Sequence, residues 1–468
     1  MQFTTISYLL FFLFVYSIYW VINNPTSKKQ FLVFASLLFY ASWSVPFLFH
    51  FLFVLLINYY FSIWIRKTRS KTSIGFCITL NLINLGFFKY FYFFLSIFSL
   101  FSENLISLKN SLPFEIILPL AISFYTFQII AYQIDIYRGK LTDSIPFYEF
   151  YLFFMFFPQL IAGPILRASE FLPQFKINTS LNKNFIFLGF IFILTGITKK
   201  VLIADNLSVL IDPVWADPSY YSASSFFMAV NGFSWQIYCD FSGYSDIAIG
   251  SAYLLGYQIP RNFQAPFLSV SFQELWKNWH TSLSNWLKDY LYISLGGNKN
   301  GTVQMYLYLL ITFTLAGLWH GASFTFILWG FLCGVCLVVE RILANLIGNP
   351  FASNLPILEK VIYLVRVLFT YYIFCITVIF FRANSLTLIP EYFTKFFFLS
   401  KGVNSIPFTP IFTYIGVALI LQFIELKKIE SIDITFSSFV SIGIYSILLF
   451  FLVGLYSGSG KEFIYFQF

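Results

Sequence analysis

Three histidines occur in this 468-residue chain, and His320 lies in the middle of a long apolar run. The run from Val303 to Val339 contains no Asp, Glu, Lys or Arg. Ionisable side chains at such depth are costly and usually face an interior cavity. Gly317 and Gly321 remove side-chain bulk near the imidazole, so a substrate or another backbone can approach closely. A lone histidine in an apolar run is more often a packing residue, but this glycine-flanked setting favours chemistry.

A second histidine, His280, lies in the segment 272–291, where apolar residues recur at helical spacing. Three tryptophans share one face of this predicted helix, and charged residues such as Lys277 and Lys288 lie opposite. This pattern predicts a continuous in-plane helix at the membrane interface, with His280 at the border of the apolar stripe. From that border an imidazole can face a protein interior. The alternative is an ordinary amphipathic surface helix.

Two further segments carry polar groups in apolar surroundings. In the segment 235–250, Asp240 and Asp246 flank Gly243, and these aspartates can be proton or cation ligands or simply helix caps. In the segment 156–167, Pro158 and Pro164 interrupt an apolar stretch. Non-helical backbone at membrane depth is tolerated only where protein or a water-filled cavity surrounds it, so a re-entrant segment is expected.

Metal chemistry has little support, because the three histidines and five cysteines lack the spacing of zinc ligands. We therefore expect no bound metal. The pair Cys333 and Cys336 resembles a redox motif, but its apolar surroundings favour a role as helix filler.

Composition identifies the elements that must position these residues. Hydrophobic residues make up 59% of the chain and charged residues 10%, whereas soluble domains carry about 25% charged residues. Long apolar runs recur along the whole chain and do not alternate as barrel strands do, which predicts an all-α polytopic membrane protein. The predicted spans are 3–22, 31–42, 47–65, 74–101, 115–137, 185–211, 225–238, 303–318, 322–340, 361–381, 408–424 and 435–456.

The net charge of +8 comes from basic residues that lie mostly in short loops. This distribution indicates positive-inside topology and contact with anionic headgroups, not nucleic-acid binding. The densest basic cluster, in 66–71, is expected on the cytoplasmic side, which places the N-terminus outside.

Four sequence blocks together resemble the membrane-bound O-acyltransferase (MBOAT) family, and within it the alginate O-acetyltransferase type. They occur in family order over 156–330 and read FFPQLIAGPILR, DFSGYSDIAIG, FQELWKNWHTSLSNWLKDYLYISLGGN and LAGLWHGASFTFILWG. Relatives of this type act on peptidoglycan and other exported glycans, and a D-alanyl transfer branch is more distant. The resemblance implies a helical bundle of roughly 11–13 spans with re-entrant and in-plane helices around a central tunnel.

The resemblance also implies the roles of individual residues. His320 matches the family's buried catalytic histidine, and His280 matches the second characteristic position. We expect the core with both histidines to occupy 139–340, between N-terminal helices in 1–138 and C-terminal helices in 341–468. The residues expected to line the tunnel are Trp319, Asn278, Tyr244, Asp240 and Trp279.

Family membership further implies substrates and location. The chain is expected in the bacterial cytoplasmic (inner) membrane, with acetyl-CoA or an acyl-carrier thioester as the cytoplasmic donor and no bound cofactor. The acceptor would be a hydroxyl of an exported polysaccharide, reached directly or through a periplasmic or extracellular acetyltransferase partner.

The residues alone leave the mechanism open. An imidazole with an ordinary pKa of about 6.5 is mostly neutral at pH 7 and suits general-base catalysis. His320 is the expected base, with His280 positioning the acyl group or relaying a proton, and a covalent acyl-histidine relay is the alternative. The resemblance itself implies another alternative, D-alanyl or other acyl transfer to a cell-envelope polymer. A glycan transporter would need a charged pathway, yet few spans carry acidic groups. A noncatalytic assembly subunit would tolerate substitution of His320.

Overall fold

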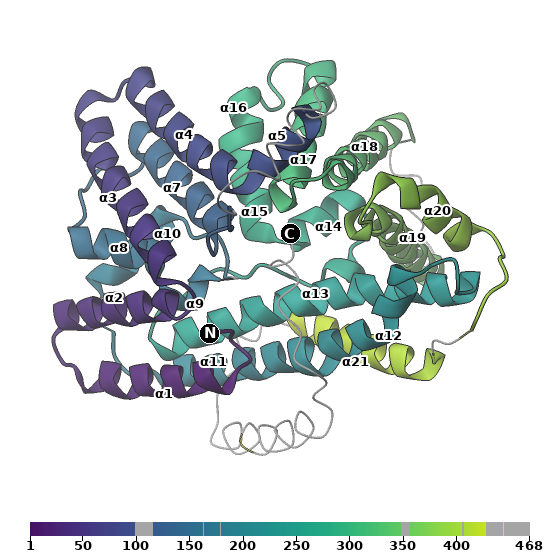
Figure 1. Ribbon diagram of the computed structural model, residues 1–468, viewed down its shortest axis with the longest axis horizontal. Helices are drawn as coiled ribbons and strands as arrows, with labels where there is room; N and C mark the ends of the chain where they lie inside the picture. Colours follow the sequence, from purple (N-terminus) through teal and green to yellow (C-terminus); the bar gives the residue numbers. More distant parts are fainter. Residues whose placement is uncertain are drawn as a thin grey trace. The chain divides into compact units, whose positions relative to one another are not determined.

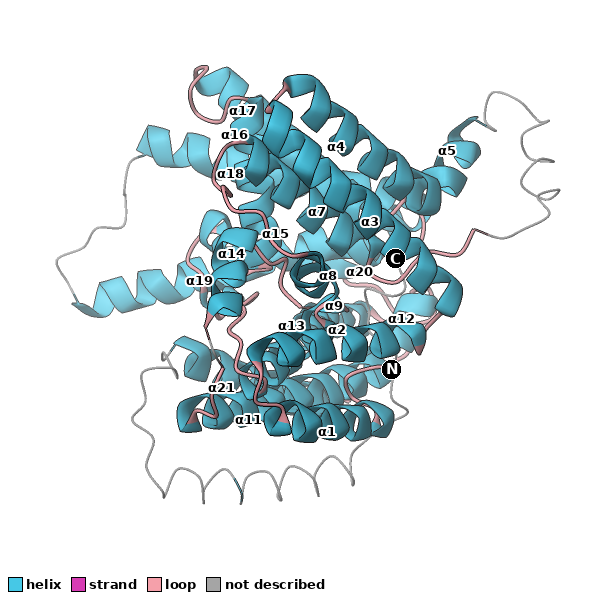
Figure 2. Cartoon of the chain, turned by 90° about the vertical axis from the view of Figure 1, so that its left-hand side faces the viewer, coloured by secondary structure: helices cyan, strands magenta, loops and turns pink. Residues whose placement is uncertain are grey.

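The structure is a computed structural model that describes residues 1–98, 116–161, 163–177, 179–347, 356–404, 407–426 and 443. Helices account for nearly all regular structure in these residues (Figure 2). An isolated bridge between Tyr221 and Val403 is the only β pairing within the described ranges. The predicted all-α class is therefore confirmed.

The chain divides into two compact units, and two of the division points fall inside helices. One unit comprises 1–189 with 248–260, and the other comprises 190–247 with 261–468. Helices α11 (Lys183–Ile197) and α13 (Ala223–Leu254) each contribute residues to both units. The division into 1–138, 139–340 and 341–468 that the sequence suggests is a division by role, and it stays a prediction.

The first unit consists of helices, and its first four helices begin at side-chain caps. Ser44 caps α3, which ends where Arg69 adopts a left-handed conformation, and Ser70 then caps α4. A π-helical turn, Gly86–Tyr90, joins α4 to α5. The helices that lie wholly in this unit are α1 (Ile6–Val21), α2 (Pro25–Ala41), α3 (Val45–Thr68), α4 (Lys71–Leu85), α5 (Phe91–Phe98), α7 (Ile122–Tyr137), α8 (Phe147–Met155), α9 (Phe157–Leu160), α10 (Ala168–Phe171) and the 3-10 helix Leu172–Lys176.

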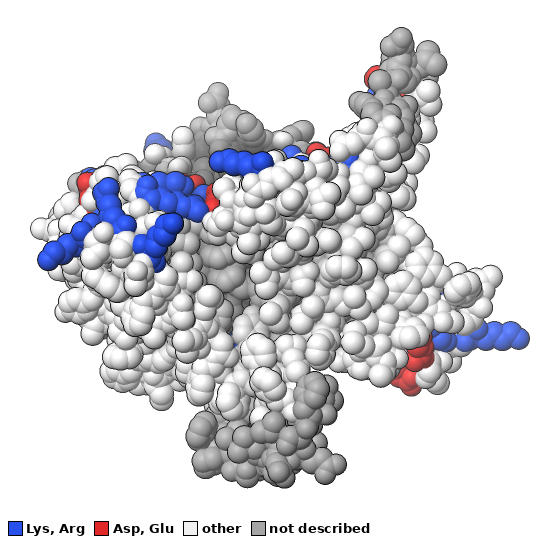
Figure 3. All heavy atoms as spheres, turned by 90° about the horizontal axis from the view of Figure 1, so that it is seen from above, with Lys and Arg blue, Asp and Glu red and all other residues white. Residues whose placement is uncertain are grey.

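Basic side chains gather at the end of this unit where α3 meets α4 (Figure 3, left). Lys67, Arg69 and Lys71 are exposed there, beside the half-buried Arg66. This is the cluster that the positive-inside rule assigns to the cytoplasmic side.

The second unit contains the residues with candidate chemistry. The π-helical segment Thr198–Ala204 joins α11 to α12, and a second π-helical segment, Leu287–Tyr292, joins α15 to α16. The other helices of this unit are α12 (Asp205–Ala216), the 3-10 helix Pro266–Leu268, α14 (Phe272–Asn278), α15 (Thr281–Trp286), α16 (Ile293–Leu295), α17 (Thr302–His320), α18 (Phe324–Ile347), α19 (Pro356–Arg382), the 3-10 helix Leu386–Leu388, α20 (Ile389–Phe397) and α21 (Phe408–Leu426).

Seven helical stretches within the described part of the chain are long and apolar enough to cross a membrane. Each contains, or nearly contains, one predicted span. They are Val45–Thr68, Lys71–Phe98, Lys183–Ala216, Thr302–His320, Phe324–Leu346, Leu358–Arg382 and Phe408–Leu426.

The remaining predicted spans have different outcomes. The spans 3–22, 31–42 and 115–137 correspond to α1, α2 and α7, which have 16, 17 and 16 residues. The span 225–238 is part of the 32-residue helix α13. The span 435–456 lies outside the described residues apart from position 443.

The expected re-entrant segment is broken where its prolines predict. Helix α8 ends at Met155, α9 has four residues, and 163–167 is non-helical and mostly buried. The prediction for 272–291 was wrong in one respect, because the segment is not one continuous helix. Helix α14 ends at Asn278, and α15 begins after His280, whose φ of 44° and ψ of 53° are left-handed. The helical periodicity of the sequence does not reveal this break.

Candidate active site

His320 is the last residue of α17, and the packing of α17 against α18 fixes its place. The two helices run side by side (Figure 1) and approach so closely that neither has room for a side chain at the contact. A Cβ on Gly317 would lie 2.2 Å from the Phe326 carbonyl oxygen, and one on Gly330 would lie 2.2 Å from the Phe313 carbonyl oxygen. Gly317 therefore makes room for a neighbouring backbone, one of the two reasons that the sequence left open.

The His320 ring is enclosed by aromatic side chains and is only 5% exposed. Its centroid lies 5.2 Å from that of Trp329 on α18 and 5.7 Å from that of Phe381 on α19. The backbone of Gly321, the next residue, packs directly against the Phe326 ring, since a Cβ there would lie 2.2 Å from that ring. Aromatic walls restrict the directions from which a substrate can reach the imidazole.

His280 lies at the break between α14 and α15 and is 1% exposed. Its ring meets Phe241 edge to face, with centroids 4.6 Å apart. Burial in these surroundings lowers the pKa of His280 to about 3, because the protein interior disfavours the charged imidazolium. The side chain is therefore neutral at pH 7 and can accept or donate a proton through hydrogen bonds.

The two histidines line one cavity of about 540 Å³. Its walls come from α14, α15, the π-helical segment 287–292, α17 and α18. The apolar part is formed by residues such as Leu283, Phe313 and Trp329, whereas Lys277, Lys288 and Arg341 make another part cationic. A volume of this size accommodates a small-molecule group, and its cations favour an anionic one.

The structure places the other predicted site residues in two settings. Trp279 lines the cavity, and the Trp319 ring lies 5.0 Å from the His320 ring and 6.1 Å from the His280 ring. Asn278 does not line this cavity and donates to the Ser269 hydroxyl at 3.1 Å. Whether any of these residues touches substrate stays a prediction.

Asp240 and Tyr244 also lie away from this cavity, around the buried cation Lys200. The Lys200 ammonium forms ion pairs with Asp240 and, at 2.8 Å, with Asp205, and it lies 5.6 Å from the Tyr244 ring centroid. The surroundings explain Asp240 as the partner of a buried charge. Its neighbour Asp246 is likewise paired, with Lys199 at 2.6 Å.

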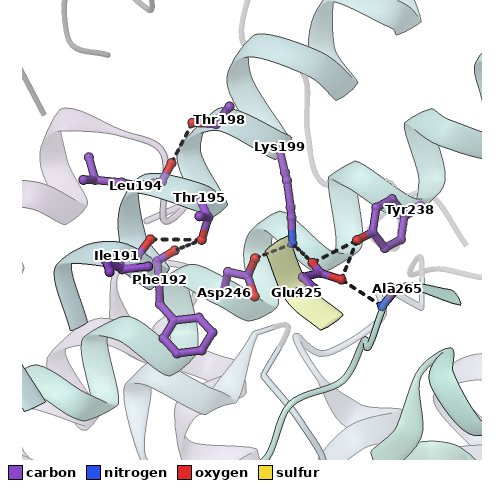
Figure 4. Close-up of polar contacts among 10 residues, drawn as sticks. All are labelled: Ile191, Phe192, Leu194, Thr195, Thr198, Lys199, Tyr238, Asp246, Ala265 and Glu425. Carbon is purple, nitrogen blue, oxygen red and sulfur yellow. Dashed lines mark hydrogen bonds and ion pairs between the residues drawn. The ribbon is translucent and has the colours of Figure 1, made fainter. Parts of the chain in front are cut away.

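Sequence reasoning missed the two consecutive lysines and Glu425. Lys199 pairs with both Asp246 and Glu425, and the Tyr238 hydroxyl donates to Glu425 (Figure 4). The signal was present, because Lys199 and Lys200 interrupt the predicted span 185–211. Two charges inside an apolar span need buried partners, and the aspartates of α13 were available candidates.

The structure thus defines a helical membrane protein with two buried histidines on one cavity. Comparison of the sequence with known families gives a more specific assignment. Residues 140–382, more than half of the chain, match the membrane-bound O-acyltransferase family. The chain belongs to this family, as the four sequence blocks indicated.

Individual relatives carry printed functions. The chain is 39% identical over 351 residues to the probable alginate O-acetylase AlgI of Pseudomonas aeruginosa, covering 73% of this chain and 66% of the relative. It is 39% identical over 349 residues to a peptidoglycan O-acetyltransferase of Helicobacter pylori, covering 68% and 65%. A teichoic acid D-alanyltransferase of Bacillus subtilis is 27% identical over 237 residues, covering 47% and 58%. The matches thus span slightly less than two thirds of the first two relatives.

Proposed function

We propose that this protein is a membrane O-acetyltransferase that passes an acetyl group from a cytoplasmic thioester to hydroxyls of an exported polysaccharide. The observation that carries the proposal is the shared cavity, on which His280 and His320 both lie. The names of the relatives support the acetyl group and a polysaccharide acceptor. A bacterial cytoplasmic membrane location and an external partner that completes the transfer belong to the same proposal.

In the proposed reaction, a hydroxyl oxygen attacks the thioester carbonyl carbon while the His320 imidazole removes the hydroxyl proton. The new C–O bond forms, the C–S bond breaks, and the leaving thiolate takes the proton back from His320. General-base catalysis of this kind contributes about 10²–10⁴-fold in rate. His280, held neutral by burial, would orient the acyl group or relay the proton. A covalent acyl-histidine intermediate remains the alternative path.

The cationic part of the cavity supports a donor with anionic groups. Lys277, Lys288 and Arg341 lie on the same cavity as the histidines. Acetyl-CoA carries phosphates, and an acyl-carrier thioester carries a phosphopantetheine group, so both fit cationic surroundings. Neither donor is a resident cofactor, because each is consumed in the reaction.

The decisive experiment follows labelled acetyl groups from acetyl-CoA into polysaccharide in membranes that contain the full chain. Transfer is expected with the native protein and is expected to be lost in His320→Ala at equal protein level. His50→Gln is the matched control, because His50 bonds Asn84 at 2.9 Å in the other unit. Undiminished transfer in His320→Ala would overturn the assignment and favour an assembly subunit. Glycan movement without acetylation would favour a transporter.

D-alanyl transfer is the second candidate, supported by the 27% identity to the teichoic acid D-alanyltransferase. The same membranes supplied with labelled D-alanyl thioester separate the two reactions. Incorporation of D-alanine in place of acetyl would replace the proposed acyl group while leaving the histidine roles intact.

A further inference from the structure

The backbone on either side of His280 is hydrogen-bonded to the segment that precedes α14. We call residues 261–268 the strap. The Gln264 N–H donates to the Asn278 carbonyl at 3.0 Å, and the Thr281 N–H donates to the Asn262 carbonyl at 2.9 Å. These two bonds lie on either side of Trp279 and His280. The strap therefore fixes the backbone at the point where α14 gives way to α15.

The strap is in turn bonded to α21, more than 150 residues further along the chain. The Ala265 N–H donates to Glu425 Oε2 at 2.9 Å, and the Phe267 N–H donates to Gln422 Oε1 at 3.2 Å. Gln422 and Glu425 are three residues apart, so they share one face of the helix. Ala265 has φ 47° and ψ 56°, a conformation that is unfavourable for a residue with a Cβ. Bonds to α21 stabilise it.

One ion pair and several hydrogen bonds fix the Glu425 carboxylate in place. It pairs with Lys199, and it accepts the Tyr238 hydroxyl, which lies 2.9 Å from each of its oxygens (Figure 4). Lys199 is 2% exposed and is held from the other side by Asp246. A carboxylate with these partners has little freedom to move, so the Ala265 N–H meets an acceptor at a fixed position.

Aromatic side chains of the strap pack against Trp279, which forms part of the cavity wall. The Phe263 and Phe267 rings lie 5.2 Å and 5.9 Å from the Trp279 ring, centroid to centroid. Trp279 lines the cavity next to His280. A shift of the strap would therefore move both a wall of the cavity and the backbone of the histidine.

From these contacts we propose that Gln422 and Glu425 are positioning residues, which act through the strap to set the orientation of His280. The proposal rests on the proposed acetyltransferase function for its kinetic consequences. A displacement of about 1 Å at a reacting group can lower a rate about 10²-fold. The strap requires side-chain oxygens on α21 that accept its two N–H groups. A negative charge on α21 is not sufficient for this role.

The kinetic test compares four variants of the full chain, each normalised to folded protein. Gln422→Leu and Glu425→Ala remove an acceptor, and kcat is expected to fall about 10²-fold while KM for acetyl-CoA changes by less than about threefold. Glu425→Gln keeps an acceptor oxygen on a side chain of equal length and should retain activity within about threefold of native. Phe423→Ala, on the exposed face of the same helix, is the control.

A second readout is independent of acetyl transfer. The rate at which diethyl pyrocarbonate modifies His280, followed by mass spectrometry, should rise at least about tenfold in Gln422→Leu and Glu425→Ala. It should stay at the native rate in Phe423→Ala and Glu425→Gln. If Glu425→Ala does not accumulate, Gln422→Leu decides, because it leaves the ion pairs intact.

The outcomes separate the two proposals. Loss of folded protein with native kcat and native His280 reactivity would show a purely structural role and overturn the positioning role. Absence of acetyl transfer by the native chain would overturn the proposed function, while the reactivity of His280 would still decide the role of α21.

Discussion

The indole ring of Trp319 meets the imidazole of His280 edge to face, with centroids 6.1 Å apart. Trp319 also directly precedes His320, whose ring lies 5.0 Å from the indole. One aromatic side chain thus contacts two imidazoles that are forty residues apart in the sequence. The relative position of the histidines depends on how α17 packs against the break between α14 and α15.

The buried, neutral state of His280 makes the stability of the protein depend on pH. The folded-state pKa of His280, about 3, lies below the ordinary value of 6.5. The contribution of neutral His280 to the free energy of unfolding is therefore complete above pH 6.5 and is lost as the pH falls toward 3. Between pH 7.5 and 5.0 this loss amounts to about 2 kcal/mol. Denaturant titrations in detergent should show that His280→Gln loses correspondingly less stability than the native protein. Equal losses in both proteins would contradict the prediction.

The close contact of α17 and α18 predicts a large effect from a single methyl group. Gly317→Ala and Gly330→Ala should each destabilise the protein by at least about 1–3 kcal/mol, because the added Cβ meets backbone that cannot rotate away. Activity per folded molecule should also fall, since His320 ends the displaced helix. Thermal denaturation and acetyl transfer measure the two effects.

The control for this contact is Gly416→Ala, which lies within α21 and has nothing within 4 Å of the added Cβ. It should leave stability unchanged or raise it by up to about 1 kcal/mol, since alanine favours helix. If Gly416→Ala loses as much stability as Gly317→Ala, replacement of any glycine is harmful. The close contact of α17 and α18 would then not be the cause of the destabilisation.

The cationic side of the cavity predicts a change in donor affinity. Lys288→Gln and Arg341→Gln should each raise KM for acetyl-CoA about 3- to 10-fold with little change in kcat, because they weaken attraction to an anionic donor. The difference from native should shrink as salt rises, since exposed charges are screened. Lys71→Gln, at an exposed lysine of the other unit, should behave as native. A fall in kcat at constant KM would argue against donor binding.

Asp240 is expected to support the fold instead of the reaction. In Asp240→Asn, Lys200 keeps Asp205 as a partner, so the amount of folded protein should fall while kcat per folded molecule stays within about threefold of native. Lys200→Met should be far more harmful, because it removes the cation with which both buried carboxylates pair, at a cost of about 3–5 kcal/mol. Protein level and single-turnover acetyl transfer distinguish these effects. If the Asp240→Asn protein accumulates normally but is inactive, Asp240 takes part in the reaction and the prediction is wrong.

The sequence predicted most of the long helices because an apolar run is a local property of the chain. Helices α3, α17 and α18 appear where continuous hydrophobic residues require them. The break at His280 could not be predicted in this way. It lies in a segment with good helical periodicity, between one hydrogen bond that Asn262 accepts and another that Gln264 donates.

Ion pairs and hydrogen bonds between residues far apart in the sequence could not be predicted either. Asp240 and Asp246 were recognised as unusual, but their partners Lys200 and Lys199 lie about forty residues earlier, on another helix. The predicted span 408–424 ended one residue before Glu425, so the residue that meets the strap fell outside it. The two histidines could be selected from the sequence because each lies in a distinctive local setting, and only the fold shows that they share a cavity.

The bond between Ala265 and Glu425 joins residues 160 positions apart, and this separation has a consequence for biosynthesis. When a ribosome has made both histidines and α17, the helix that completes the strap has not yet been translated. The hydrogen bonds that Ala265 and Phe267 donate to α21 therefore form only after α21 has been synthesised. A chain that ends before α21 contains both imidazoles but lacks the two acceptor oxygens that bond the strap.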